Sequence, residues 1–193
     1  WTVWQGFNSS WTHQGRWQYA YDFVIDKEGQ TYRRGGTRLE DYYAFKKPVL
    51  SPCKGRIIKV VANLPDNQPG VVDKTNNWGN LVLIDTTLGY FVELSHFAQN
   101  TIRVKEGEWV EACAMLGLCG NSGYSPQPHI HVQVQATAQL GALTLPFSFH
   151  GYLELERFVA NDLPAENSRV QPICANRTMD FQTAFVLDQQ FTF

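Results

Sequence analysis

Two histidines separated by a single residue, His129 and His131, have the spacing in this chain that most clearly indicates chemistry. Over residues 129–135 polar and apolar side chains alternate, which predicts a strand with one polar and one apolar face. Residues i and i+2 of a strand point to the same side, so both imidazoles would enter one space. This favours a metal or catalytic site. The chain has no His-Glu-x-x-His sequence, so the pattern does not indicate a helix-borne zinc site.

A catalytic zinc ion takes three ligands from the protein and keeps one open position. The chain has only five histidines, so few residues can complete such a site. His13 lies in a polar stretch, and Asp22 lies in the aromatic run Tyr19–Phe23. A carboxylate in an apolar strand is costly unless it faces solvent or binds something positive. His96 ends the strand-like run 90–95, where a partly buried histidine is also ordinary.

Short alternating or apolar runs recur between turns rich in Gly, Pro, Asn and Asp, and helical periodicity is scarce. The expected strands are Tyr19–Ile25, Gly55–Val61, Leu81–Asp85, Tyr90–Leu94, Ala114–Cys119 and His129–Gln135. They predict a compact, loop-rich, all-β fold with antiparallel pairing. We expect a single domain over residues 1–193, with its core at about 11–135 and a C-terminal elaboration at about 136–193. Within that elaboration, 155–183 is expected to be a polar excursion and Phe185–Leu187 a strand.

The composition excludes several classes of function. Charged residues make up 18% of the chain and the formal net charge is −2, whereas nucleic-acid binding needs a basic face. No run of about 20 apolar residues exists, so no membrane span is expected. The chain begins at Trp1 and ends in the strand-like Phe191–Phe193, so both ends are expected to be cuts from a longer precursor.

Seven fragments, taken in order, resemble the lysostaphin-like zinc endopeptidases of the M23 group, which cleave peptide cross-links in bacterial cell walls. The resemblance covers about residues 11–135. Its fragments are His13 to Asp22, VLSPCKGRI at 49–57, GNLVLI at 79–84, LSHF at 94–97, IRVKEGEWV at 102–110, LGLCGNSG at 116–123 and PHIHV at 128–132. It implies the family's open, barrel-like antiparallel fold with long loops.

The resemblance implies a role for each candidate residue. His13, Asp22 and His131 match the family's three zinc ligands. His96 and His129 match its two catalytic histidines that do not bind the metal. His129 would act as general base, and His96 would hydrogen-bond the attacking water or the developing oxyanion, but the sequence leaves open which histidine does which. The first two ligands are nine residues apart, a longer spacing than the commonest one, with an insertion at about 16–19.

The four cysteines, at positions 53, 113, 119 and 174, contain no Cys-x-x-Cys pair, so a cysteine-based zinc site is not expected. Cys113 and Cys119 lie on one expected strand, too far apart to bond. The pairings left open are 53–113 with 119–174, and 53–119 with 113–174, and four free thiols are equally open. The resemblance favours Cys53–Cys113, because two turns close together in the family fold carry these residues. Such a disulfide would suit an extracytoplasmic compartment.

The predicted function is therefore that of a zinc-dependent endopeptidase, secreted or periplasmic and monomeric, whose substrate is bacterial peptidoglycan peptide. Three alternatives remain: a zinc-free module that binds or regulates a partner, a peptidase acting on another protein, and a wall-binding domain with a structural zinc. Loops at 26–47, 63–78 and 120–128 are expected to form the cleft walls by family analogy. The aromatic candidates to line the cleft are Trp78, Tyr90 and Tyr124.

Overall fold

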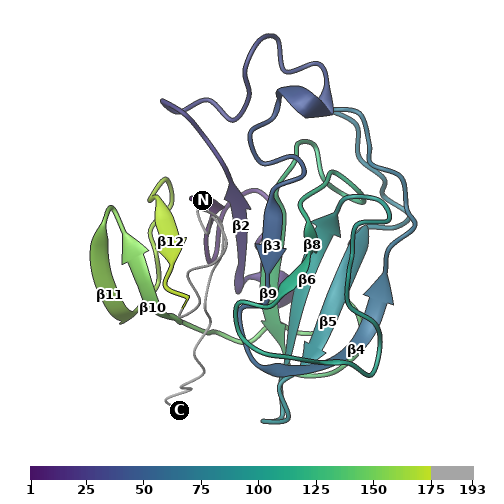
Figure 1. Cartoon of the computed structure of the whole chain (residues 1–193), viewed down its shortest axis with the longest axis vertical. Coiled ribbons are helices and arrows are strands. Elements are labelled where there is room, and N and C mark those ends of the chain that lie inside the picture. The colour runs from purple at the N-terminus through teal and green to yellow at the C-terminus, as the bar shows by residue number, and fades with distance from the viewer. Residues whose placement is uncertain (175–193) are drawn as a thin grey trace.

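The computed structural model describes residues 1–174, and strands dominate their regular structure. The largest sheet has seven strands, in the order β1 (Thr2–Gln5), β2 (Ala20–Val24), β9 (Ile130–Gln135), β6 (Phe91–Phe97), β5 (Asn80–Asp85), β4 (Gly55–Val61) and β7 (Trp109–Val110) (Figure 1). A three-stranded sheet has the order β11 (Arg157–Asp162), β10 (Phe149–Glu154) and β12 (Val170–Pro172). The remaining elements are the pair β3 (Pro48–Leu50) and β8 (Met115–Leu118), and the short 3-10 helices η1 (Gly15–Trp17) and η2 (Leu39–Asp41).

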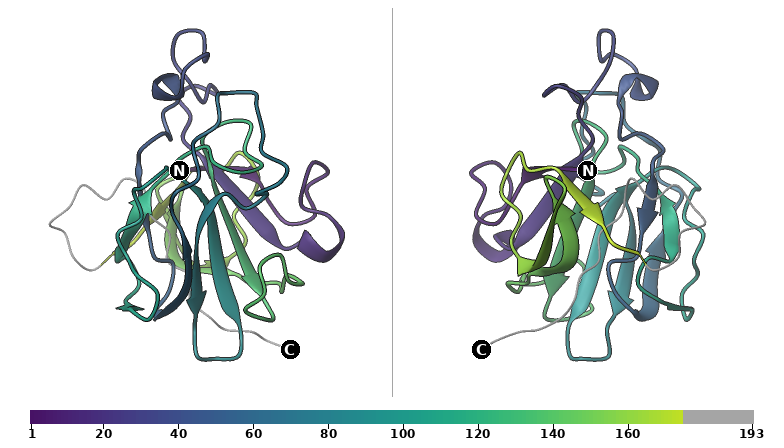
Figure 2. Two further views of the ribbon diagram at one scale, coloured as in Figure 1. Left: turned by 90° about the vertical axis from the view of Figure 1, so that its right-hand side faces the viewer. Right: turned by 60° about the vertical axis from the view of Figure 1, so that its left-hand side comes forward.

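The predicted all-β antiparallel fold with long loops is confirmed. Every pairing between these strands is antiparallel, and the large sheet is open, with β1 and β7 at its edges. The segment that contains η2 projects beyond one end of the sheets (Figure 2). None of the helices in residues 1–174 is long and apolar enough to cross a membrane.

One continuous hydrophobic core joins the two larger sheets. It contains Phe23 and Val132 from the seven-stranded sheet, and Phe149 and Tyr152 from β10. The rings of Phe23 and Phe149 meet edge to face, with their centroids 5.7 Å apart. Burying one such side chain contributes about 1.5–3 kcal/mol. The C-terminal strands are therefore held to the main sheet by the same apolar burial that stabilises the sheet itself.

The expected polar excursion over 155–183 is wrong for the part that the structure describes. Residues 157–162 form the edge strand β11, which is mostly exposed and pairs with β10. Residues 170–172 form β12, whose Val170 is buried. An edge strand with little buried surface has no apolar alternation, so its sequence does not differ from that of a loop. The expected strand Phe185–Leu187 lies outside the described residues.

The disulfide joins Cys113 to Cys174, with 6.1 Å between the two Cα atoms. The favoured pairing of Cys53 with Cys113 is therefore wrong. Cys53 is a free thiol packed in the hydrophobic core, and Cys119 is also free and buried. Burial raises the pKa of Cys53 to about 12, so this thiol stays protonated. Cys113 instead ties the turn before β8 to the segment that follows β12.

Candidate active site

The register between β2 and β9 places Asp22 directly opposite His131. Asp22 Oδ1 lies 2.8 Å from His131 Nδ1, and both side chains are buried. Apolar neighbours such as Val132 fill the core on the other face. A slip of one residue would move a whole strand's side chains to the wrong face, so burial of the core fixes this pair.

His13 reaches the same point from the loop before η1. Its side chain is buried, and its Nε2 lies 3.3 Å from Asp22 Oδ1. Its Nδ1 lies 2.8 Å from the backbone carbonyl oxygen of Gly6. A carbonyl only accepts hydrogen bonds, so Nδ1 carries the proton and Nε2 presents a lone pair to the site.

The insertion between His13 and Asp22 is folded into η1. Gly15 has a φ of +58°, a left-handed conformation that glycine adopts without strain. The Trp17 indole N–H then donates to the carbonyl oxygen of Gly141 at 3.0 Å. The extra residues are therefore held against the loop after β9, and the long spacing still brings the histidine beside the carboxylate.

The donor atoms of His13, Asp22 and His131 all lie within 4.8 Å of one another. His13 Nε2 is buried and has no hydrogen-bond partner among the described residues. A buried nitrogen of this kind calls for a bound partner. Two imidazoles and one carboxylate are a common donor set for zinc. The residues present therefore fit a divalent metal ion.

Charge in the site is set by Asp22. Although burial opposes ionisation, the nearby His129 and His13 hold the pKa of Asp22 well below its usual range. Burial also disfavours a charged imidazole at position 131, but the hydrogen bond to Asp22 raises the pKa of His131. The carboxylate is therefore ionised at neutral pH and attracts a cation or a proton to this point.

His96 and His129 lie beside the trio, with their ring centroids 4.6 Å apart. His96 Nδ1 lies 2.8 Å from the Ser122 carbonyl oxygen, and His129 Nδ1 lies 2.8 Å from that of Gln127. Each Nδ1 therefore carries the proton, and each Nε2 keeps a lone pair. Burial lowers the pKa of both imidazoles, which are neutral near pH 7. Both can accept a proton.

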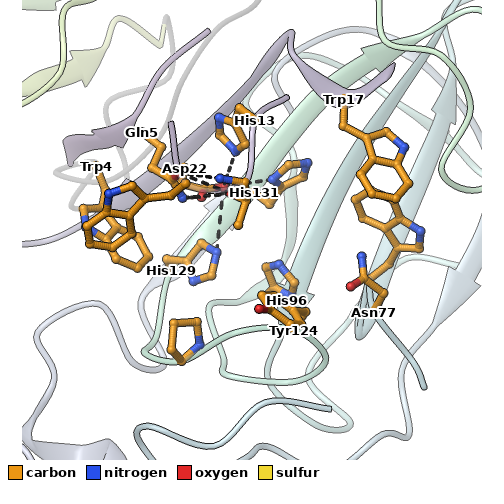
Figure 3. A pocket seen from close by; sticks show the side chains of 14 residues that line it. Trp4, Gln5, His13, Trp17, Asp22, Asn77, His96, Tyr124, His129 and His131 are labelled. Carbon is orange, nitrogen blue, oxygen red and sulfur yellow. Dashed lines mark hydrogen bonds and ion pairs between the residues drawn. The ribbon is translucent and has the colours of Figure 1, made fainter. Parts of the chain in front are cut away.

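The backbone at His96 adopts a strained conformation. Its φ is +70°, which is uncommon for a residue other than glycine and costs on the order of 1–3 kcal/mol. Two backbone hydrogen bonds hold it, from His96 N to the Trp78 carbonyl oxygen and from Gly120 N to the His96 carbonyl oxygen. This turn at the end of β6 directs the imidazole into the cavity (Figure 3).

All five histidine and aspartate candidates line one cavity of about 460 Å³ (Figure 3). The remaining lining residues are mainly aromatic or polar: Trp4, Gln5, Trp11, Thr12, Trp17, Asn77, Trp78, Tyr124 and Pro126. Figure 3 shows Trp4 and Trp17 on opposite sides of the cluster formed by His13, Asp22 and His131. The cavity therefore has a polar, ionisable floor between two aromatic walls.

Each aromatic wall is built around a pair of indoles that meet edge to face. Trp17 and Trp78 have their centroids 5.5 Å apart, and Trp4 and Trp11 have theirs 5.7 Å apart. Trp4 also packs against His129 at 5.3 Å. Contacts of this geometry contribute about 0.5–1.5 kcal/mol beyond area burial, so the walls also support the floor.

The predictions about the cleft walls are partly correct. Trp78 and Tyr124 line the cavity, as expected, but Tyr90 is buried in the hydrophobic core. Loop 26–47 supplies no lining residue, because it projects beyond the end of the sheets. The N-terminal residues take its place. The signal for them was available, since four of the six tryptophans lie within the first 17 residues.

The sequence model of peptidase family M23 matches residues 39–141, which is more than half of the chain. The chain belongs to peptidase family M23. The matched range contains His96, His129 and His131 and begins after His13 and Asp22. The assignment of the chain to an M23 peptidase family is thus confirmed, while the N-terminal half of the site rests on the geometry described above.

Solved M23 structures share this fold. The catalytic domain of a mutant of the prophage-encoded M23 protein EnpA from Enterococcus faecalis aligns with a TM-score of 0.51 and 15% identity, covering 75% of this chain and 87% of that one. The antimicrobial peptidase lysostaphin from Staphylococcus simulans aligns with a TM-score of 0.50 and 18% identity, and the alignment covers 76% of this chain and 48% of that one. LytU aligns with a TM-score of 0.50 and 17% identity, and the alignment covers 75% of this chain and 79% of that one. At these identities the likeness shows the fold alone. A comparison with curated proteins finds no match.

Proposed function

We propose that this M23 protein is a zinc-dependent endopeptidase that hydrolyses peptide cross-links of bacterial peptidoglycan. The observation that carries the proposal is the buried Nε2 of His13, which has no hydrogen-bond partner among residues 1–174 and lies beside Asp22 and His131. His13 would bind the ion through Nε2, and His131 through Nδ1, because these are the nitrogens nearest to Asp22 Oδ1. One carboxylate and two neutral imidazoles leave half of the charge of a divalent ion uncompensated.

A bound zinc ion would supply Lewis acidity toward the scissile carbonyl and a water molecule. The chain's own residues would handle the protons. His129 takes a proton from the attacking water at Nε2 and returns it to the leaving amine. Its ring is oriented by Gln127, and Asp22 Oδ1, 3.8 Å from Nε2, stabilises the positive charge that the ring acquires.

His96 would hold the attacking water. Its Nδ1–H donates to the Ser122 carbonyl, so its Nε2 can accept a hydrogen bond but has no proton to give to an oxyanion. This geometry favours the water-binding role over oxyanion stabilisation. The general-base role is therefore given to His129, which lies beside the carboxylate of Asp22.

Three observations support the substrate and its location. The cavity is open to a peptide between two aromatic walls, and the fold is shared with lysostaphin, a peptidase described as antimicrobial. The disulfide Cys113–Cys174 suits a secreted or periplasmic protein. The shared hydrophobic core supports a single peptidase domain. We propose that this domain acts as a monomer.

A digest of purified, cross-linked muropeptides, analysed by mass, tests the proposal. We expect cross-linked dimers to be cleaved to monomers, no cleavage after treatment with a chelator, and recovery when zinc is added back. Protein substrates should be incubated in parallel. Cleavage of a protein with intact muropeptides would point to the protein-directed alternative, and chelator-resistant cleavage would contradict the zinc mechanism.

A further inference from the structure

A chain of buried glutamine side chains runs along β9 away from His131. His131 Nε2 lies 3.0 Å from Gln133 Oε1, and Gln133 Nε2 donates to Gln135 Oε1 at 2.9 Å. Gln135 Nε2 donates in turn to the backbone carbonyl oxygens of Thr137 and Gln139. Both Gln133 and Gln135 are fully buried, so water does not compete for these groups.

The far end of this chain determines the direction of every hydrogen bond in it. Backbone carbonyls only accept, so the amide nitrogen of Gln135 must face them and its Oε1 must face Gln133. Gln133 then donates through Nε2 and turns its Oε1 to His131. The imidazole is therefore protonated at Nε2, and its Nδ1 presents a lone pair to Asp22.

This tautomer leaves two acceptors facing each other, since His131 Nδ1 and Asp22 Oδ1 are 2.8 Å apart. Two lone pairs at that distance repel unless a proton or a metal ion lies between them. The glutamine chain thus prepares His131 for a cation, and a proton shared with Asp22 would be displaced when the metal binds.

A second glutamine holds Asp22 from the opposite strand. Gln5 stands next to Asp22 in the β1–β2 pairing, at a register shift, and donates from Nε2 to Asp22 Oδ2 at 2.6 Å. Its Oε1 accepts from the Ser9 hydroxyl and from Thr12. Donors therefore surround the amide oxygen, which fixes the amide nitrogen on the carboxylate. Oδ2 is engaged, and Oδ1 is left facing His13 and His131, the two proposed histidine ligands.

The residue opposite Gln133 explains why position 133 suits an amide. Glu93 on β6 pairs with Gln133 and is fully buried, and burial raises the pKa of its carboxyl to about 7. A second carboxylate at position 133 would face that group, and each would disfavour ionisation of the other. Each of the three proposed ligands has a neutral outer partner: the Gly6 carbonyl for His13, Gln5 for Asp22 and Gln133 for His131.

We propose that Gln133 and Gln5 are positioning residues that orient His131 and Asp22 for the metal ion, and that Gln135 anchors Gln133. This inference rests on the proposed metal site. Outer partners of metal ligands of this kind typically contribute about 10- to 100-fold in metal affinity. The amides act through the ligands that they hold.

Zinc affinity, measured by competition with a chromophoric chelator, tests this assignment. We expect Gln133→Leu and Gln5→Leu each to weaken zinc binding by about 10- to 100-fold, and Gln135→Leu to weaken it less. The double variant Gln133→Glu with Glu93→Gln keeps an acceptor for His131 but removes the donor to Gln135 Oε1, so it should bind zinc more tightly than Gln133→Leu and less tightly than wild type. The visible spectrum of the cobalt-substituted protein should change in Gln133→Leu.

Val134→Ala is the matched control. Its side chain lies between the two glutamines in sequence, but it is part of the hydrophobic core, so the variant loses stability without touching the site. Its zinc affinity should equal that of wild type. Wild-type affinity in both Gln133→Leu and Gln5→Leu would overturn the assignment, and if one does not fold, the other decides. Failure of the unaltered protein to bind zinc would instead refute the proposed function.

Discussion

The floor of the cavity and its walls are built in different ways. Asp22 and His131 stand on adjacent central strands, and the pairing of those strands fixes their distance. Trp4, Trp11 and Trp17 lie on or near the N-terminal segment, and the Trp11 side chain is 70% exposed. The Asp22–His131 pair is therefore set by sheet register and burial, whereas the walls depend on a few contacts between side chains. Changes in the floor should alter the chemistry, and changes in the walls should alter substrate binding.

The largest effect is expected at the floor. His131→Ala removes a proposed metal ligand and should abolish both zinc content and hydrolysis. His129→Ala should keep full zinc content and lower kcat by about 10²- to 10⁴-fold, as for loss of a general base. Zinc content by elemental analysis and turnover of muropeptides measure the two effects. Full activity in His129→Ala would refute the general-base role.

A smaller effect is expected at Gly79, where two loops beside the cavity approach each other closely because this residue has no side chain. A Cβ on Gly79 would lie 2.4 Å from the Ser122 carbonyl oxygen, and its φ is +63°. Gly79→Ala should therefore destabilise the fold by more than the roughly 1–3 kcal/mol typical of backbone strain alone, and should lower activity, because Ser122 orients His96. Gly89→Ala is the matched control, since φ there is +91° with open space around the added Cβ. Urea unfolding should show a larger loss for Gly79→Ala, and equal losses would mean that the loops are not held by this contact.

The smallest effect is expected at the aromatic walls. Trp78→Ala removes an indole that lines the cavity, and an aromatic contact of this ring with substrate would be worth about 0.5–1.5 kcal/mol, so KM should rise by about 2- to 10-fold with little change in kcat. Trp109→Ala is the control, because Trp109 is 57% exposed and does not line the cavity. Steady-state kinetics on a defined muropeptide separates the two constants. A fall in kcat alone would show that Trp78 supports the floor and not the substrate.

The difference between the floor and the walls of the cavity also explains which parts of the site the sequence could predict. Alternation on 129–135 was sufficient to place both histidines on one face, because strand geometry has a fixed period. All-β character followed from the same kind of pattern. The wall formed by Trp4 and Trp11 was not predicted, because only the folded chain brings Trp4 of β1 against His129. Gln5 illustrates this, since only the pairing of β1 with β2 brings it to Asp22.

The cysteines and the C-terminal strands show a second reason for failure. Cys53 and Cys113 both lie in turns, and the sequence does not show that the side chain of Cys53 points into the core. The partner of Cys113 lies 61 residues away, beyond strands whose exposed residues carry no periodic signal. Long-range pairing of this kind is determined by tertiary packing and not by local pattern.

The most direct test of the central claim is the position of the metal itself. Crystals of the zinc-loaded protein, with anomalous diffraction recorded at the zinc absorption edge, would locate it. We predict a single strong peak bonded to His13 Nε2, Asp22 Oδ1 and His131 Nδ1, with the imidazoles of His96 and His129 unbound beside it. A peak bonded to His96 or His129, or no peak at the trio in zinc-loaded crystals, would contradict the assignment.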